Sequence, residues 1–216
     1  MEQAATMELA AELVRRHPAL AAARPALEAA VSLVGDALAA GGTLYLCGNG
    51  GSAADCDHIA GELLKGFLLP RPLPAAAAAR LAALGGEDGA YLGRKLQGGL
   101  RAVTLTGHPA LSSAVINDNG GDLAFAQQLW ALGRAGDVLL AISTSGNARN
   151  VRLAALAAKA LGMKVVLLSG ETGGQLRPLA DLALCVPERE TFKVQELHLP
   201  LYHTFCAMLE RRFFAP

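Results

Sequence analysis

Hydrophobic residues recur with two different periods along the chain. From about residue 4 to 40 the sequence is rich in Ala and Leu at helical spacing, with one break near His17-Pro18. This pattern predicts one or two long amphipathic helices. Short apolar runs then alternate with helical stretches, and a closing helix is expected over residues 191–213. The predicted strands cover residues 43–47, 101–106, 137–142, 164–169 and 182–186.

Strands that are apolar throughout and alternate with helices predict a parallel sheet covered on both faces. The expected fold class is α/β: a three-layer αβα sandwich around five parallel strands, formed as a single domain by residues 1–216. One stretch departs from this alternation. Residues 71–99 hold an Ala/Leu segment, a Gly-Gly-Glu-Asp-Gly turn and a second possible helix. Because this is too long for an ordinary connection, we predict an inserted helical hairpin.

Composition narrows the functional classes. The 216 residues are 52% hydrophobic and 18% charged, a surplus of apolar residues that suggests burial in subunit contacts. Nineteen Lys and Arg balance nineteen Asp and Glu, so we expect no nucleic-acid partner. No long uncharged apolar run predicts a membrane span, and the start of the chain does not resemble a secretory signal. The four cysteines are dispersed, which is typical of reduced thiols in a cytoplasmic protein.

A glycine-rich loop, Gly48-Asn-Gly-Gly-Ser52, follows the first predicted strand and opens a helix. Glycine lets the backbone approach a ligand, and a helix N-terminus offers free N–H groups. With Ala53 the loop also matches a dinucleotide-binding pattern, but the acidic residue expected about twenty positions later is absent. We therefore expect no nucleotide cofactor. Ser52 is also expected to cap the helix, with Asp55 completing a capping box.

A second polar loop, residues 143–147 (STSGN), follows the third predicted strand. Three hydroxyl groups and backbone donors before a helix form an anion site suited to a phosphate ester. A single loop of this kind is often only a capping turn. Two such loops at neighbouring strand ends favour a ligand site, because parallel sheets bind ligands beyond the carboxyl ends of their strands.

Two helices carry side chains that could perform chemistry. His58 and Glu62 are four residues apart on the helix after the first loop, and Asp55 lies one turn earlier on the same side. They could supply a base, an acid or two metal ligands, or form only an exposed pair. The closing helix adds further polar side chains: Gln195, Glu196, His198 and His203. For His198 we expect a structural role.

Taken together, these motifs resemble the phosphoheptose (sedoheptulose 7-phosphate) isomerases of the sugar isomerase (SIS) fold. The resemblance is carried by residues 46–58 (LCGNGGSAADCDH) with Glu62, the pair Asn117-Asp118, residues 136–147 and Gln195 to His203. It implies a flavodoxin-like sheet and a cytoplasmic homotetramer with sites near subunit contacts. It also implies an enzyme that converts sedoheptulose 7-phosphate to D-glycero-D-manno-heptose 7-phosphate through an enediolate, for bacterial surface heptose (lipopolysaccharide).

The resemblance also implies a role for each matching residue. Glu62 would be the catalytic base, and His203 would be the acid–base partner. Zinc, one ion per subunit, would be bound by His58, Glu62, Gln195 and His203, a donor set that suits this metal. Phosphate would be held by Ser143, Thr144 and Ser145. The sugar would contact Asn49, Gly50, Gly51, Ser52, Glu62, Asn117, Asp118 and Gln195.

The spacing on the closing helix adds a geometric constraint. Gln195 and His203 would be about 12 Å apart along a straight helix, too far for one ion to bind both. Either Pro200 kinks the helix, or the two residues come from neighbouring subunits. We expect the second arrangement, and therefore an active site shared between subunits.

Three features depart from the family pattern. Ala148 stands where relatives often have a further phosphate-binding serine, and Gly66, beside Lys65, stands where they commonly have an arginine. The stretch 71–99 is not part of the pattern. Another sugar phosphate therefore remains an alternative substrate. A second alternative is a non-catalytic regulator of the same fold that binds the bacterial replication initiator. A third, a sugar-phosphate sensor, would normally have a DNA-binding domain, and the first 40 residues are too apolar for one.

Overall fold

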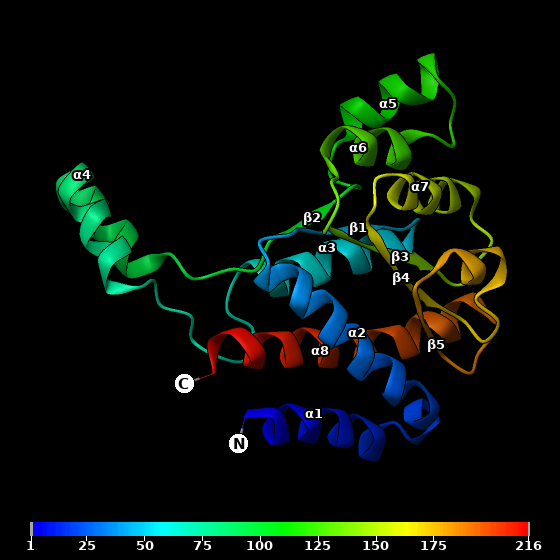
Figure 1. The fold of residues 1–216 in the computed structure, drawn as a ribbon, viewed down its shortest axis with the longest axis horizontal. Helices are drawn as coiled ribbons and strands as arrows, with labels where there is room; N and C mark the ends of the chain where they lie inside the picture. Colours follow the sequence, from blue (N-terminus) through cyan, green and yellow to red (C-terminus); the bar gives the residue numbers. More distant parts are fainter. Residues whose placement is uncertain (1, 216) are drawn as a thin grey trace.

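The computed structural model describes residues 2–215, and five parallel strands form its centre (Figure 1). The strand order is β2-β1-β3-β4-β5, the flavodoxin-like order, and every neighbouring pair is parallel. All five predicted strands are present. They are β1 (Leu44–Cys47), β2 (Ala102–Thr104), β3 (Val138–Ser143), β4 (Lys164–Ser169) and β5 (Leu182–Cys185).

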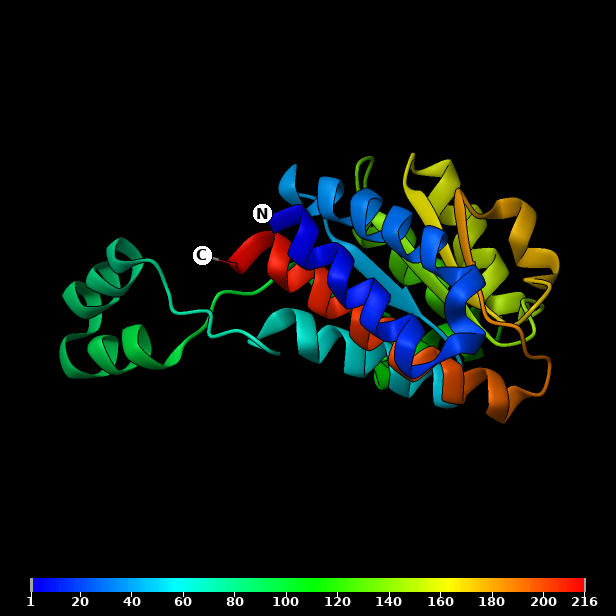
Figure 2. The same ribbon diagram turned by 90° about the horizontal axis from the view of Figure 1, so that it is seen from below.

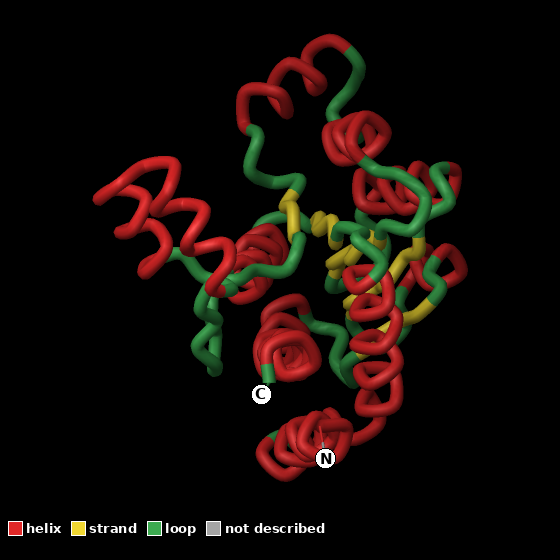
Figure 3. Tube along the Cα trace, turned by 60° about the vertical axis from the view of Figure 1, so that its left-hand side comes forward, coloured by secondary structure: helices red, strands yellow, loops and turns green. Residues whose placement is uncertain are grey.

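Alternate residues of each strand face two separate hydrophobic cores. Leu44 and Leu46 belong to one core, whereas Tyr45 and Cys47 between them belong to the other. The first core is covered by α2 (Arg24–Ala39), α3 (Gly51–Leu64) and α8 (Thr191–Phe214). The second is covered by α6 (Ala124–Leu132), α7 (Arg149–Ala160) and the 3-10 helix η2 (Gly174–Leu179). This confirms the predicted three-layer sandwich, which Figure 3 shows with the strands between helices.

The N-terminal region is helical and broken where the sequence predicts. Helix α1 (Glu2–Arg16) ends before Pro18, a 3-10 helix η1 (Pro18–Ala23) follows, and α2 then returns to the sheet. Helix α1 lies along the outer side of α8 (Figure 1). No helix within residues 2–215 is long and apolar enough to cross a membrane.

The predicted hairpin is confirmed as α4 (Ala75–Lys95), two helical segments joined at Gly86. Gly86 has a φ of +52°, a conformation that L side chains rarely adopt. The segments pack closely, since a Cβ on Gly89 would lie 1.8 Å from the carbonyl oxygen of Leu81. The hairpin projects from the rest of the molecule (Figure 2), and a hydrogen bond of 2.7 Å from the Gly98 N–H to the Arg71 carbonyl joins the two chain segments that lead to it.

Candidate active site

The two polar loops lie side by side at the carboxyl ends of β1 and β3. β1 leads to α3 on one face of the sheet, and β3 leads to α7 on the other, so this is the topological switch point at which such sheets bind ligands. Asn49 and Asn150 link the loops through two amide hydrogen bonds of 2.9 and 2.8 Å. The predicted proximity of the loops is confirmed. The role of Asn150 was not predicted, because only the fold brings the first turn of α7 to the β1 loop.

The first loop does not cap its helix as predicted. Helix α3 begins at Gly51 after Gly50, which has a φ of +55°, and no side chain caps it. Ser52 is buried instead, so the capping-box prediction is wrong. The N–H groups of Ser52 and Ala53 donate to the carbonyls of Asn49 and Gly50, at 3.0 Å each, so backbone turns rather than a side chain satisfy this helix end. Gln195 packs against the same turn, because a Cβ on Gly51 would lie 2.3 Å from Gln195 Nε2.

Hydrogen bonds to the backbone of the second loop hold its conformation. Some of its hydroxyl groups therefore remain available to a ligand. The Ser169 hydroxyl donates to the Ser143 carbonyl at 2.6 Å, and Ser145 Oγ accepts from the Asn147 N–H at 3.2 Å. Thr144 and Ser145 line a cleft of about 280 Å³. Arg189, which sequence reasoning did not select, lines the same cleft and forms an ion pair with Glu171. Because Glu171 and Glu188 line the cleft as well, it has no excess of positive charge, and the case for an anion site rests on the hydroxyl groups and backbone donors.

The carboxylate and imidazole side chains of α3 and α8 meet further from the loops. His58 Nε2 lies 3.4 Å from Glu62 Oε1 and 3.3 Å from His203 Nε2. Glu62 and His203 are thus brought together around one atom within a single subunit. Burial lowers the pKa of His203, His58 lowers it further, and Glu62 opposes both effects. A cleft of about 390 Å³, lined by α1, Phe67 and α8, opens at His203.

The two polar loops and the cluster of His58, Glu62 and His203 lie at opposite ends of α3. Glu62 is three turns beyond Gly51, roughly 16 Å along the helix axis. Helix α8 is continuous from Thr191 to Phe214 with Pro200 inside it, so Gln195 stays near Gly51 while His203 stays near His58. The cleft at Thr144 and the cleft at His203 have no lining residue in common.

The pair Asn117 and Asp118 ends helix α5 (Pro109–Asp118), which packs on α6. Asn117 Nδ2 donates to Asp118 Oδ1 at 2.8 Å, and both residues are exposed. None of the hydrogen bonds in the described part of the chain ties either residue to the two loops. The loop after α5 does approach them, since Asp122 forms an ion pair with Arg149 at the start of α7.

The donors around His58 match zinc in chemical type: two imidazoles, a carboxylate and the more distant Gln195 amide. The separations of 3.3 and 3.4 Å from His58 Nε2 are close to the edge of a zinc tetrahedron, about 3.3 Å for bonds of about 2.0–2.1 Å. Within residues 2–215 no group of three or more His, Cys, Asp or Glu side chains is arranged so that it could hold a metal ion. The zinc site therefore stays a prediction.

Comparisons with known proteins identify the family. A family model described as SIS domain matches residues 8–97 and 96–170. The chain is 41% identical over 192 residues to the phosphoheptose isomerase of Burkholderia pseudomallei (strain 1710b), covering 87% of this chain and 84% of that protein. For the phosphoheptose isomerase of Helicobacter pylori (strain P12) the identity is 38% over 187 residues, with the same coverage. The chain belongs to the phosphoheptose isomerase family.

A solved phosphoheptose isomerase of this family, from Neisseria gonorrhoeae, superposes with a TM-score of 0.72 at 33% identity, covering 97% of this chain and 99% of that one. Family membership confirms the recognised resemblance and the prediction of an isomerase.

One departure from the family pattern is partly compensated. Lys65 Nζ lies 3.2 Å from Glu62 Oε2, so a cation stands beside this carboxylate although Gly66 replaces the expected arginine.

A buried ion pair joins the ends of the two helices that carry the cluster. Arg71 and Glu210 are both fully buried, and Arg71 Nε lies 2.8 Å from Glu210 Oε1. Arg71 also donates to the carbonyls of Glu62 (3.0 Å) and Leu63 (2.8 Å) at the end of α3. Burial raises the pKa of Glu210, but the Phe67 N–H, a neighbouring N–H and Arg71 together hold this pKa below its usual value.

The buried His198 predicts a pH-dependent stability. Burial lowers the pKa of His198 to about 4, from 6.5 for an exposed histidine. Below pH 6.5 the His198 imidazole binds a proton in the unfolded chain but not in the folded chain. The free energy of unfolding therefore falls as the pH falls. We expect a loss of about 1.4 kcal/mol per pH unit between pH 6.5 and 4, or about 3 kcal/mol in all. Urea titrations across this range measure it.

The His198→Gln variant is the control for this prediction. Without the imidazole, the contribution of His198 to the slope should disappear and that of His203, whose pKa is also lowered, should remain, even though the variant is less stable at neutral pH. An unchanged slope in the variant would assign the pH dependence to other groups.

Proposed function

We propose that this protein is an aldose–ketose isomerase that converts sedoheptulose 7-phosphate to D-glycero-D-manno-heptose 7-phosphate. The single observation that carries the proposal is the meeting of Glu62 and His203 at His58, in a family whose members bear this name. In this proposal the enzyme is a cytoplasmic homotetramer whose product supplies bacterial surface lipopolysaccharide with heptose.

The reaction moves a carbonyl group from C2 to C1 without net oxidation. Glu62 removes a proton from C1, an enediolate forms, and the proton is returned to C2. Burial and His58 lower the pKa of His203, which favours its neutral imidazole, and a neutral imidazole can transfer a proton between the two oxygens. A zinc ion held by His58, Glu62, His203 and Gln195 would supply Lewis-acid stabilisation of the enediolate.

The phosphate is assigned to Ser143, Thr144 and Ser145, with Arg189 nearby. The sugar is assigned to the loop 49–52 and to Asn117 and Asp118. Because roughly 16 Å of α3 separates this half of the site from Glu62, we propose that the second half comes from a neighbouring subunit. The same arrangement would bring Gln195 of one chain to the His58 cluster of another.

Turnover of sedoheptulose 7-phosphate by the purified protein, with and without a chelator, tests the activity. Formation of the aldose supports the proposal. Binding of the sugar without turnover would contradict it and would favour the regulator alternative. Turnover of a different ketose phosphate alone would contradict only the assigned substrate.

Mixing two inactive variants tests the shared site. Glu62→Gln chains and Thr144→Val chains are each expected to be inactive, and co-refolding them at equal amounts should restore about a quarter of the sites by random pairing of subunits. The matched control mixes Glu62→Gln with His203→Asn chains. These residues belong to the same half, so no activity should return. Recovery in the control alone, or in neither mixture, would contradict this division of the site.

A further inference from the structure

The segment of residues 65–71, between α3 and the hairpin, adjoins both proposed catalytic residues. Glu62 lies in the last turn of α3, immediately before this segment. Phe67, within the segment, packs against His203 with ring centroids 5.7 Å apart, and both side chains line the cleft that opens at His203. The conformation of the segment therefore affects the surroundings of the carboxylate and of the imidazole.

Side chains from distant parts of the chain fix this segment. The N–H group of Gly66 donates to Gln97 Oε1 at 2.6 Å. The next three N–H groups, of residues 67–69, donate to the two carboxylate oxygens of Glu210 at 2.7 to 3.0 Å. Gln97 lies just after the hairpin and Glu210 lies on α8. Four consecutive N–H groups are thus held between the base of the hairpin and the closing helix.

Arg71 connects the same carboxylate to the end of α3. Its Nε lies 2.8 Å from Glu210 Oε1, while its other nitrogens donate to the carbonyls of Leu63 and Glu62 at 2.8 and 3.0 Å. Carbonyl groups in the last turn of a helix have no partner within the helix. The face of the guanidinium lies 4.5 Å from the ring centroid of Phe214. Arg71 therefore fastens the turn that carries Glu62 to α8.

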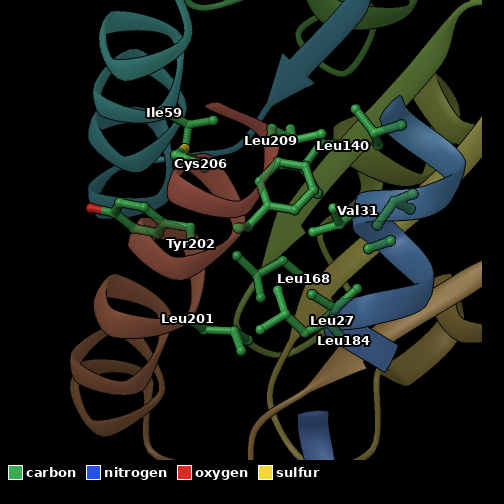
Figure 4. Packing of buried hydrophobic residues seen from close by; sticks show 14 of the residues in the cluster. Leu27, Val31, Ile59, Leu140, Leu168, Leu184, Leu201, Tyr202, Cys206 and Leu209 are labelled. Atoms are coloured by element: carbon green, nitrogen blue, oxygen red, sulfur yellow. The ribbon is translucent and has the colours of Figure 1, made fainter. Parts of the chain in front are cut away.

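The contact between α3 and α8 does not depend on this ion pair alone. Ile59 of α3 and Cys206 of α8 are fully buried in one core, where Figure 4 shows them close together. The Tyr202 hydroxyl of α8 also lies 3.0 Å from His58 Nδ1. A buried ion pair adds little net stability, because the loss of hydration of both charges offsets their attraction. What this pair supplies, and apolar side chains could not, is hydrogen bonding to five backbone groups beside the cluster.

We propose that Arg71 and Glu210 are positioning residues for the isomerisation. They place Glu62 through the end of α3, and they place His203 through the backbone of Phe67. The inference rests on the proposed function, which makes Glu62 and His203 the catalytic pair. Displacing a reacting group by about 1 Å can reduce a rate by about 10²-fold, even when the substituted residue does not touch the substrate.

Arg71→Met combined with Glu210→Met tests the positioning role, because it removes the hydrogen bonds without leaving a single buried charge. We expect kcat to fall by about 10²-fold and KM to change less, although the variant melts at a higher temperature than Glu210→Ala. Proton NMR provides a readout without turnover. The ring protons of His203 are assigned by their absence in His203→Asn, and they should shift because the adjacent Phe67 ring moves. Spectra are recorded with a chelator, so that bound metal does not contribute.

Arg212→Met combined with Asp36→Met is the matched control. Arg212 on α8 also lies over an aromatic ring, that of Phe213 at 5.9 Å, and also donates to a backbone carbonyl, that of Ser32 at 3.2 Å. Its ion pair with Asp36, at 2.6 Å, joins α8 to α2 rather than to the end of α3. This double variant should leave kcat and the His203 signals unchanged.

A folded Arg71→Met/Glu210→Met variant with unchanged kcat, or with unchanged His203 signals, would overturn the proposal. If this variant does not fold, Arg71→Lys replaces it. The lysine keeps a positive charge opposite Glu210 but lacks the planar fork that reaches both carbonyls, and the same two results would overturn the proposal. If the unmodified protein does not turn over sedoheptulose 7-phosphate, only the proposed function is contradicted, and the His203 signals still decide the positioning role.

Discussion

Glu62→Gln is expected to reduce kcat for sedoheptulose 7-phosphate by about 10²- to 10⁴-fold, the usual contribution of a positioned general base. Glutamine has the size of glutamate but cannot accept the proton from C1. KM should change less than kcat, because the loop proposed to bind the phosphate, at Ser143–Ser145, is separate from Glu62. The measurement is the rate of aldose formation at saturating and at limiting substrate.

Asp57→Asn is the control for this prediction. Asp57 lies on the same helix, is exposed and accepts a hydrogen bond of 2.8 Å from Thr106, away from the cluster. The same carboxylate-to-amide change there should leave kcat near its original value. More than about a tenth of the activity remaining in Glu62→Gln would exclude Glu62 as the base.

Glu210→Ala is expected to destabilise the protein by about 3–5 kcal/mol, since it leaves the Arg71 guanidinium buried without its counter-ion. The N–H groups of Phe67, Leu68 and Leu69 would also lose their acceptor, at 2.8, 2.7 and 3.0 Å. For a chain of this size the melting temperature should fall by roughly 10 °C. Activity should fall too, because Arg71 binds the Glu62 carbonyl and Phe67 packs against His203.

Two further variants test the cause of this loss. Asp36→Ala breaks the exposed ion pair with Arg212 that also joins α8 to α2, and should cost no more than about 1 kcal/mol. Arg71→Met combined with Glu210→Met removes both buried charges and should recover part of the stability. A double variant less stable than Glu210→Ala would contradict an unpaired buried charge as the main cause.

Local sequence determined the secondary structure and the position of the two polar loops. Short, continuous apolar runs such as β3 favour buried strands, and the break at Pro18 follows from its missing N–H group. The loops 48–52 and 143–147 were predictable because parallel strands present their carboxyl ends at one edge. The hairpin at α4 followed from its length and its glycine turn.

Only the tertiary structure decided how distant side chains combine. Tyr202 and His58 are 144 positions apart, and Arg71 and Glu210 are 139 positions apart, so their contacts depend on how α3 and α8 pack rather than on any local pattern. The same packing buries Ser52, which the local pattern predicted as a cap. Helical periodicity tells which residues share a face of one helix, whereas the partner of that face is set by the whole core.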